Sequence, residues 1–326
     1  MDLIVFILVL VAAVSIGIIV FIGIFKEILD IASFGFFNAK ISGLKSKMNA
    51  PSEVREMDLY ELENFIEKFD KNFKKDFKSI ADSSPDSVEI FFRAFHLRYE
   101  KEVLKEIMRG TEVEPYGIFT KEMIRTLRQA PLSEYPSKLE GTPYAKISFN
   151  KSLQEIERDI DFLYYREILS AAQKTDTKNA TVLKRYIKTE LDVRNILTVL
   201  RCKKYGVENV LDYVIPIGYE IPEWKLKNLA EAQDVSGVLD LLMDTEYKFL
   251  TELRERYGET KSLFIFEKEL KKYLLNLAKD LSIIHPYTAG KALYYVILRE
   301  KEVNDILAIY EAKKEEFDEI LEEVIL

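Results

Sequence analysis

Residues 183–206 read LKRYIKTELDVRNILTVLRCKKYG, and this stretch contains the pattern on which the fold prediction rests. At its centre is Glu190-Leu191-Asp192-Val193, a Glu followed by any residue, an acid and a Val. The same pattern stands at Glu100–Val103 and at Glu300–Val303, so the copies are 90 and 110 residues apart. Apolar residues follow each copy at helical spacing, so the helices would present matching faces. Such recurrence indicates one supersecondary unit copied three times.

Other landmarks recur at compatible offsets. Ser152-Leu153 returns 110 residues later as Ser262-Leu263, and each pair opens a long helical pattern. A connecting segment with Leu-x-x-Ala followed by Thr-x-Tyr occurs at 127–144 and again at 229–247. Clusters of Pro, Ser, Asn and Asp, the residues that favour turns, separate these patterns. The agreement of several landmarks supports the repeat, since a four-residue pattern alone arises by chance in a Glu-rich chain.

The composition favours helices throughout. Only 12 Gly and 9 Pro occur in 326 residues, while Leu, Ile, Lys and Glu fill long stretches at helical spacing. We therefore predict an all-α fold of three similar helical bundles, at residues 34–142, 143–235 and 236–326. A pseudo-threefold, funnel-like arrangement and an open row of bundles are both compatible with the repeat.

The first residues carry the strongest local signal in the chain. Leu3–Phe25 is a block of 23 residues without a charge, and at about 1.5 Å per residue such a helix spans a hydrocarbon core of about 30 Å. A cleaved signal peptide is the alternative, but it needs a basic start and a shorter apolar stretch, whereas Asp2 precedes this block. We predict a membrane helix and connector at residues 1–33, with Leu3, Ile18 and Phe25 inside the membrane.

The charges after this block predict its orientation. Lys26, Lys40, Lys45 and Lys47 follow it and no basic side chain precedes it, so the positive-inside rule places the rest of the chain in the cytoplasm. Lys40, Lys45 and Lys47 are also candidates for contact with acidic lipid headgroups or a membrane partner, although ordinary flanking charge explains them equally well. The aromatic cluster that follows marks either the headgroup level or the first contact with the soluble body; it comprises Phe34, Phe36 and Phe37.

Several classes of chemistry are disfavoured. The net charge of −8 argues against a general nucleic-acid binder. A single cysteine, Cys202, points to a reducing compartment, and with two histidines it is too little for a zinc site or a nucleophile–His–acid triad. The P-loop pattern is missing, and Thr288–Lys291, the nearest fragment, lacks the required glycine and Ser/Thr. We expect no enzyme activity, cofactor, metal or small-molecule substrate.

One carboxylate arrangement keeps a second interpretation open. The acids that open the three repeated patterns, Glu100, Glu190 and Glu300, would form a carboxylate ring if the units were arranged about a threefold axis. Solvated helix faces with i, i+4 ion pairs are the commoner explanation of such residues. A metal-dependent helical enzyme is therefore a minor alternative, and it predicts bound iron or manganese.

Three stretches together resemble a known family. They are Phe37-Asn38-Ala39-Lys40 through Lys47, the helix at Leu183–Gly206 with Asp192, Asn195, Ile196, Leu200 and Arg201, and the run from Pro286 to Lys313 with Tyr294, Glu300, Glu302 and Ile306. In combination they resemble the C subunit of the archaeal and bacterial V/A-type ATP synthases, which is homologous to the d subunit of the eukaryotic vacuolar ATPase. The resemblance covers about residues 34–326.

The resemblance implies a non-catalytic connector of a rotary ATP synthase. Its expected partners are the proteolipid subunits of the rotor ring, the D and F subunits of the central stalk, and membrane lipid, with the soluble part on the cytoplasmic face of the cell membrane. Leu3–Phe25 departs from the family, whose members typically start near Phe36 or Phe37, and we predict that it enters the lipid-filled lumen of the ring. A single-span helical tether outside any rotary complex is the alternative.

Overall fold

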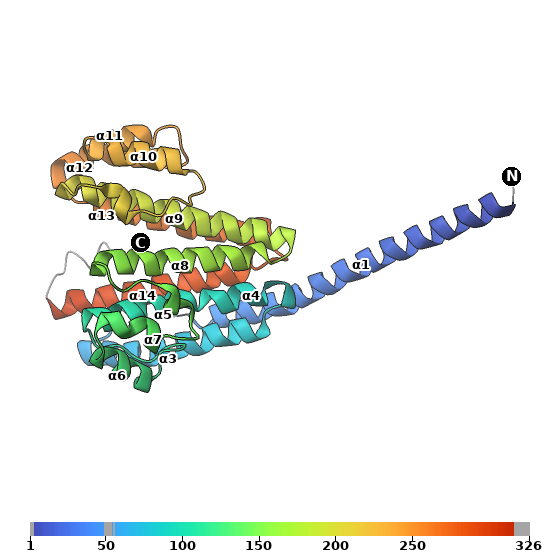
Figure 1. Cartoon of the computed structure of the whole chain (residues 1–326), viewed down its shortest axis with the longest axis horizontal. Helices are drawn as coiled ribbons and strands as arrows, with labels where there is room; N and C mark the ends of the chain where they lie inside the picture. The colour runs from blue at the N-terminus through green and yellow to red at the C-terminus, as the bar shows by residue number, and fades with distance from the viewer. Residues whose placement is uncertain (1–2, 49–53, 55, 316–326) are drawn as a thin grey trace. The chain divides into compact units, whose positions relative to one another are not determined.

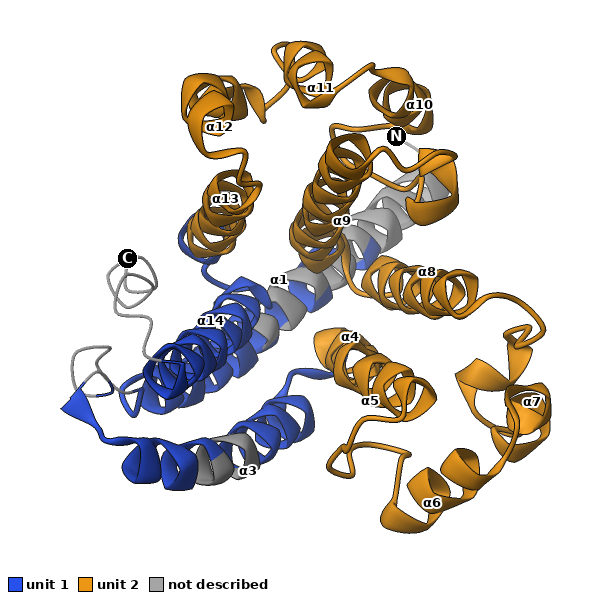
Figure 2. Cartoon of the chain, turned by 90° about the vertical axis from the view of Figure 1, so that its left-hand side faces the viewer, with its two compact units in different colours: residues 1–86, 282–326 blue, residues 87–281 orange. Residues whose placement is uncertain are grey.

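The computed structural model describes residues 3–48, 54 and 56–315, and most of these residues are helical (Figure 1). No strand occurs among these residues, in which Tyr116 and Phe119 form an isolated β-bridge. The predicted all-α fold is therefore confirmed. The chain divides into two compact units, residues 1–86 with 282–326 and residues 87–281 (Figure 2).

The first unit combines the two ends of the chain. Its long helices are α1 (Leu3–Lys45), α3 (Leu59–Ser83) and α14 (Gly290–Lys314), and each contacts the other two. Asp58 and Glu61 form a capping box that starts α3, because each side chain accepts a hydrogen bond from the other residue's backbone N–H. The buried side chains of α1, α3 and α14 form the core of this unit and include Phe34, Phe37, Ile41, Phe77, Ile80, Tyr295 and Val296.

Helix α1 continues without a break from the predicted membrane segment into this core. Its 43 residues correspond to about 65 Å. Phe34 and Phe37 are buried in the unit, whereas Phe36 is 76% exposed, so two of the three aromatic residues pack into the body of this unit. The Asn38 amide donates a hydrogen bond of 2.7 Å to the Pro286 carbonyl and ties α1 to the turn before α14.

The structure describes the backbone of the predicted membrane segment from Leu3 onward and only some of its side chains. Within the part of the chain that the structure describes, no helix has both the length and the apolar character needed to cross a membrane. The side chains of Leu3 and Ile18 lie outside the described residues, and Phe25 is 53% exposed. The structure thus shows the helix, and its insertion in a membrane stays a prediction.

The second unit is built from four long helices and two short-helix links. The long helices are α5 (Leu97–Arg109), α8 (Leu153–Gln173), α9 (Thr177–Tyr205) and α13 (Phe264–Ile284), and α4 (Asp86–Phe95) precedes them. The first link holds α6 (Lys121–Gln129), η1 (Leu132–Glu134), α7 (Tyr135–Lys138) and η2 (Pro143–Lys146). The second holds η3 (Val210–Tyr213), α10 (Glu223–Glu231), α11 (Val235–Leu241), η4 (Lys248–Leu253) and α12 (Arg254–Thr260).

Local sequence explains where the long helices start and stop. Ser152 and Glu155 form a capping box at the start of α8. The Asp176 side chain accepts the Asn179 N–H at the start of α9, and Gly206 ends that helix in the left-handed region at φ 66°. These signals separate α8 from α9 by a tight turn and allow the two helices to pack side by side.

An apolar core packs around each of the two links of the second unit. One lies between α5, the first link and α8, with Leu104, Phe119 and Ile160 among its members. The other lies between α9, the second link and α13, and it includes Ile196 and Leu229. Each core thus joins a long helix to the link that follows it. The predicted division at 34–142, 143–235 and 236–326 and its funnel arrangement stay predictions.

Candidate functional site

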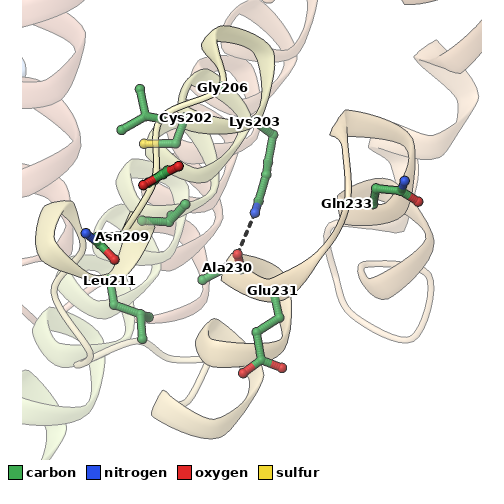
Figure 3. Close-up of a pocket in the computed structure, with 11 residues that line it drawn as sticks. Cys202, Lys203, Gly206, Asn209, Leu211, Ala230, Glu231 and Gln233 are labelled. Atoms are coloured by element: carbon green, nitrogen blue, oxygen red, sulfur yellow. Dashed lines mark hydrogen bonds between the residues drawn. The ribbon is translucent and has the colours of Figure 1, made fainter.

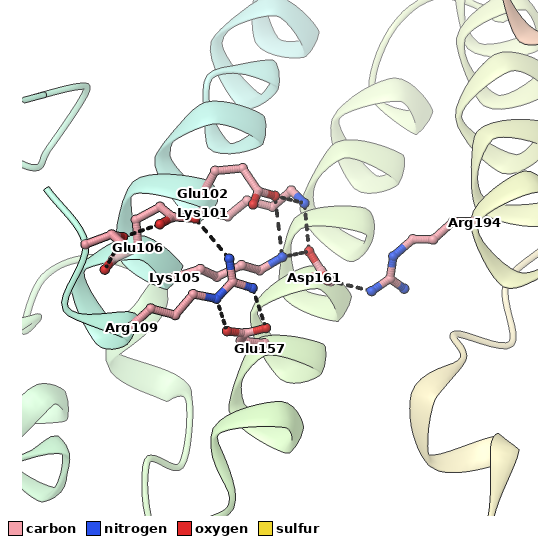
Figure 4. A network of polar contacts seen from close by, with 9 residues as sticks. Lys101, Glu102, Lys105, Glu106, Arg109, Glu157, Asp161 and Arg194 are labelled. Atoms are coloured by element: carbon pink, nitrogen blue, oxygen red, sulfur yellow. Dashed lines mark hydrogen bonds and ion pairs between the residues drawn. The ribbon is translucent and has the colours of Figure 1, made fainter. Parts of the chain in front are cut away.

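A buried ion network joins three long helices of the second unit, α5, α8 and α9, with Asp161 of α8 at its centre (Figure 4). The Asp161 carboxylate lies 2.7 Å from Lys101 Nζ and 2.6 Å from Lys105 Nζ, both on α5. On its other side Arg194 Nη2 of α9 lies 2.5 Å away. The side chains of Lys105 and Asp161 are 8% and 7% exposed. One carboxylate therefore holds three cations from two neighbouring helices.

The electrostatics of this centre favour ionised groups. Burial alone would raise the pKa of Asp161, but attraction to Lys101, Arg194 and Lys105 outweighs it and holds the pKa well below its usual range. Burial opposes the charge of Lys101 as well, yet Asp161 and Glu102 raise its pKa above the ordinary value. Removing one member would leave buried charge without compensation.

Two further ion pairs cross between the same helices. Arg109 of α5 makes a bidentate pair with Glu157 of α8, through two N–O distances of 2.8 Å. Arg98 of α5 lies 2.6 Å from Glu190 of α9. Fork-to-fork Arg–carboxylate contacts fix relative orientation as well as distance. Ion pairs therefore connect the three helices at several positions along their length. Such contacts resist movement of one helix relative to another.

The carboxylates considered as a ring have separate partners. Glu100 accepts a hydrogen bond of 3.2 Å from the Ile118 N–H, and burial raises the pKa of Glu100 despite that bond. Glu190 pairs with Arg98. Glu300 belongs to the other compact unit. Among the described residues, no group of three or more His, Cys, Asp or Glu side chains is placed to hold a metal ion.

The acid of the central repeated pattern, Asp192, clasps a turn of the second link. It accepts hydrogen bonds from the backbone N–H groups of Tyr219, Glu220 and Ile221, at 3.1, 2.7 and 3.3 Å, and from the Tyr247 hydroxyl at 3.0 Å. Burial raises the pKa of Asp192 to about 6, although these donors favour its ionised form. A Cβ at Gly218 would lie 1.9 Å from Asp192 Oδ1, so only glycine leaves room for this approach.

A neighbouring polar contact closes the same turn. Asn195 is fully buried, one helical turn after Asp192. Its side-chain amide donates a hydrogen bond of 2.6 Å to the Ile215 carbonyl and accepts one of 3.0 Å from the Ile215 N–H. Asp192 and Asn195 both belong to the stretch that carries the family resemblance. Their observed role is to hold the second link against α9.

The predicted contact lysines lie at the end of α1. Lys40 donates hydrogen bonds of 2.9 Å to the Ser79 carbonyl and to the Ser83 hydroxyl of α3. The Lys45 ammonium lies 4.7 Å from the centre of the Tyr294 ring, and Lys47 is exposed. Lys40 therefore has a role within the first unit. Contact of these lysines with lipid or a partner stays a prediction.

Sequence reasoning missed the Asp161 network. The cations of the network are 33 to 60 residues from Asp161, and such pairings leave no local pattern. One signal was present in the sequence: Asp161 stands in an otherwise apolar stretch between Ile160 and Leu163, both buried. A lone acid on a core-facing stripe requires buried cations or hydrogen-bond donors as partners.

Comparison with known proteins places this architecture. The profile of the ATP synthase (C/AC39) subunit family matches residues 53–323. The chain belongs to this family. It is 28% identical to the C subunit of the A-type ATP synthase of Methanocaldococcus jannaschii over 94% of this chain and 90% of that protein. It is 27% identical to that of Methanothermobacter thermautotrophicus over 89% and 79%, and 30% identical to that of Methanosarcina acetivorans over 70% and 67%.

The family assignment confirms the resemblance stated from the sequence. This member of the C/AC39 family is a structural component of an ATP synthase and not its catalytic one. It is therefore associated with a membrane-bound complex. The ion network and the Asp192 clasp accordingly have a structural role.

Proposed function

We propose that this chain is the central-stalk connector of a rotary V/A-type ATP synthase and couples the membrane rotor ring to the central stalk. The observation that carries this proposal is the set of ion pairs between α5, α8 and α9. Torque passing through a helical body tends to shear neighbouring helices past one another. Buried, oriented charge pairs oppose such sliding more than apolar contacts do, because apolar contacts are non-directional.

The proposed partners are the proteolipid ring and the D and F subunits of the stalk, with the soluble part on the cytoplasmic face. Affinity purification through a tag on this chain tests the assignment: the ring and both stalk proteins should co-purify at fixed stoichiometry. A chain that purifies from membranes without them would favour the single-span tether instead.

A coupling assay tests the mechanism. In inverted membrane vesicles, ATP hydrolysis should drive ion uptake when the chain is present. In vesicles that lack the chain, ATP hydrolysis by any catalytic subunits that stay attached should continue without ion uptake. Equal ion uptake with and without the chain would contradict the coupling role.

The N-terminal part of α1 supports a second element of the proposal, insertion in the lumen of the ring. Large apolar side chains are exposed along its described residues: Val20, Phe21, Ile22, Phe25, Ile28, Leu29 and Ile31. Apolar surface of this extent calls for a lipid or protein cover. A helix leaving the rotor into bulk lipid would meet the stator during rotation, which favours an axial position. Cross-linkers placed near Ile18 should reach the ring lumen, and contacts only with bulk lipid or stator would end this idea.

A further inference from the structure

The second link of the chain is strongly acidic. Residues 206–260, which form the second link, contain twelve Asp or Glu and five Lys or Arg, a net charge of −7, whereas the whole chain has −8. The first link, residues 110–151, contains five acids and six bases, a net charge of +1. The two links carry matching sequence landmarks, so the acidity of the second is not required by their architecture.

Exposed apolar side chains gather on the same segment. Residues 205–243 expose seven large apolar side chains: Tyr205, Val207, Leu211, Tyr219, Trp224, Leu241 and Met243. Residues 110–151, all of which the structure describes, expose none. Exposed apolar residues together with one sign of charge are typical of a protein interaction surface.

A groove of about 400 Å³ lies within this surface, between the end of α9, η3 and the end of α10 (Figure 3). Val207 and Leu211 supply apolar lining, and Glu208 and Glu231 supply two exposed carboxylates. The ammonium of Lys203, also in the lining, is bound to the Ala230 carbonyl at 2.6 Å. The carboxyl end of α9 adds partial negative charge to the groove.

The exposed face of α10 extends this groove. Trp224 is 62% exposed and stands seven residues before Glu231, so the two lie on one face, about 10 Å apart. Lys227 stands between them on that face and pairs with Glu223 at 2.8 Å. An apolar anchor on α10 thus adjoins a groove that holds two carboxylates. We name this surface the α10 groove: Val207, Glu208, Leu211, Trp224 and Glu231.

We propose that the α10 groove docks a basic amphipathic helix of a partner protein. Lys or Arg side chains of that helix would face Glu208 and Glu231, and its apolar side chains would cover Trp224 and Leu211. The same charge repels anionic lipid and nucleic acid, which leaves a protein partner as the occupant. The inference deepens the proposed function by naming the chemistry of a partner, and it depends on that function only for where the partner comes from.

Binding of a defined probe tests the chemistry. A fluorescein-labelled helical peptide with one Lys face and one Leu face is titrated into the full chain in detergent, and anisotropy is recorded. Glu208→Gln with Glu231→Gln should weaken binding by roughly twofold to thirtyfold, and Trp224→Ala by about fivefold or more. The matched control, Glu122→Gln with Glu140→Gln in the first link, should change it less than about twofold.

Each other result of this titration overturns the proposal. Those results are no binding, equal binding of a peptide with Gln in place of Lys, or equal weakening by the control pair. Circular dichroism of each variant should match the wild type, because all four substituted carboxylates are exposed.

A second experiment uses the intact ATP synthase. A photo-cross-linking amino acid at position 224 should capture a protein segment of net positive charge, and the same amino acid at position 122 of the first link should not. Capture of an acidic segment or of lipid alone from position 224 would refute the docking inference. Failure of the chain to co-purify with the synthase would refute the proposed function and leave the peptide result standing.

Discussion

Replacement of Asp161 by Asn gives the sharpest test of the ion network. The substitution keeps the shape of the side chain and removes the charge that faces Lys101, Lys105 and Arg194, at 2.7, 2.6 and 2.5 Å. Each contact is strongly attractive when taken alone, but burial of the four charges offsets most of that energy. What the variant loses is the compensation of three clustered cations, which costs about 3–5 kcal/mol for a buried site.

The unfolding of the second unit should show this loss directly. Domains of 150–250 residues lose about 2–4 °C in Tm per kcal/mol, so D161N should lower the transition by roughly 6–20 °C. Trp224, the only tryptophan of the chain, lies in that unit and reports its unfolding by fluorescence. The matched control is Asp159→Asn, two residues earlier on α8, where the carboxylate is 25% exposed and pairs with Lys151 at 2.6 Å. It should cost at most about 1 kcal/mol.

The pH dependence gives the refuting measurement. The pKa of Asp161 is 3.8 in an unfolded chain and well below that when folded, so its stabilisation is present above about pH 4 and disappears as the pH falls through the folded value. The difference between wild type and D161N should stay constant from about pH 7 to 5 and shrink in strong acid. A D161N variant no less stable than D159N at neutral pH would show that the network does not hold the helices together.

Three further predictions concern the turn held by α9. Gly218→Ala should lower the free energy of unfolding in urea by about 1–3 kcal/mol because its Cβ would overlap Asp192, whereas Gly237→Ala, whose nearest contact is 3.5 Å, should be neutral or stabilising. Asn195→Ala should cost about 2–5 kcal/mol and remove hydrogen-exchange protection from the Ile215 amide, since two buried backbone groups lose their partner. Folding raises the pKa of Asp192 from 3.8 to about 6. The stability that this group contributes is therefore present below about pH 4 and is lost as the pH rises through 6. Asp192→Asn should remove this pH-dependent loss, as measured by urea titrations at pH 4, 5 and 6.

The helical class and several helix ends were predictable because they depend on local sequence. Ser152 begins a pattern that the structure shows as a capped helix, and Gly206 ends one in the conformation that favours glycine. Apolar residues follow the central repeated pattern at helical spacing, and two of them, Ile196 and Leu200, are fully buried.

The polar contacts were not predictable from the same patterns, because they join residues that are distant in sequence. The repeated Glu-x-acid-Val pattern aligned Glu100 with Glu190, whereas the residue that holds a glycine turn in the way Glu100 does is Asp192, two positions later. Glu100 meets the turn at Gly117 and Asp192 the turn at Gly218, where in both cases a Cβ would lie 1.9 Å from a carboxylate oxygen. A sequence pattern compares residue types only, whereas tertiary hydrogen bonds determine which acid holds the glycine turn.

The continuity of α1 has a geometric consequence. Some 31 residues separate Leu3 from Phe34, where the helix enters its unit, and they span about 46 Å. A tilt of about 10° at the base would therefore sweep the tip through about 8 Å. The direction of α1 is fixed by the packing of a few side chains, those of Phe34, Phe37 and Ile41. Even a conservative substitution there would therefore produce a larger displacement at the N-terminal end of the helix.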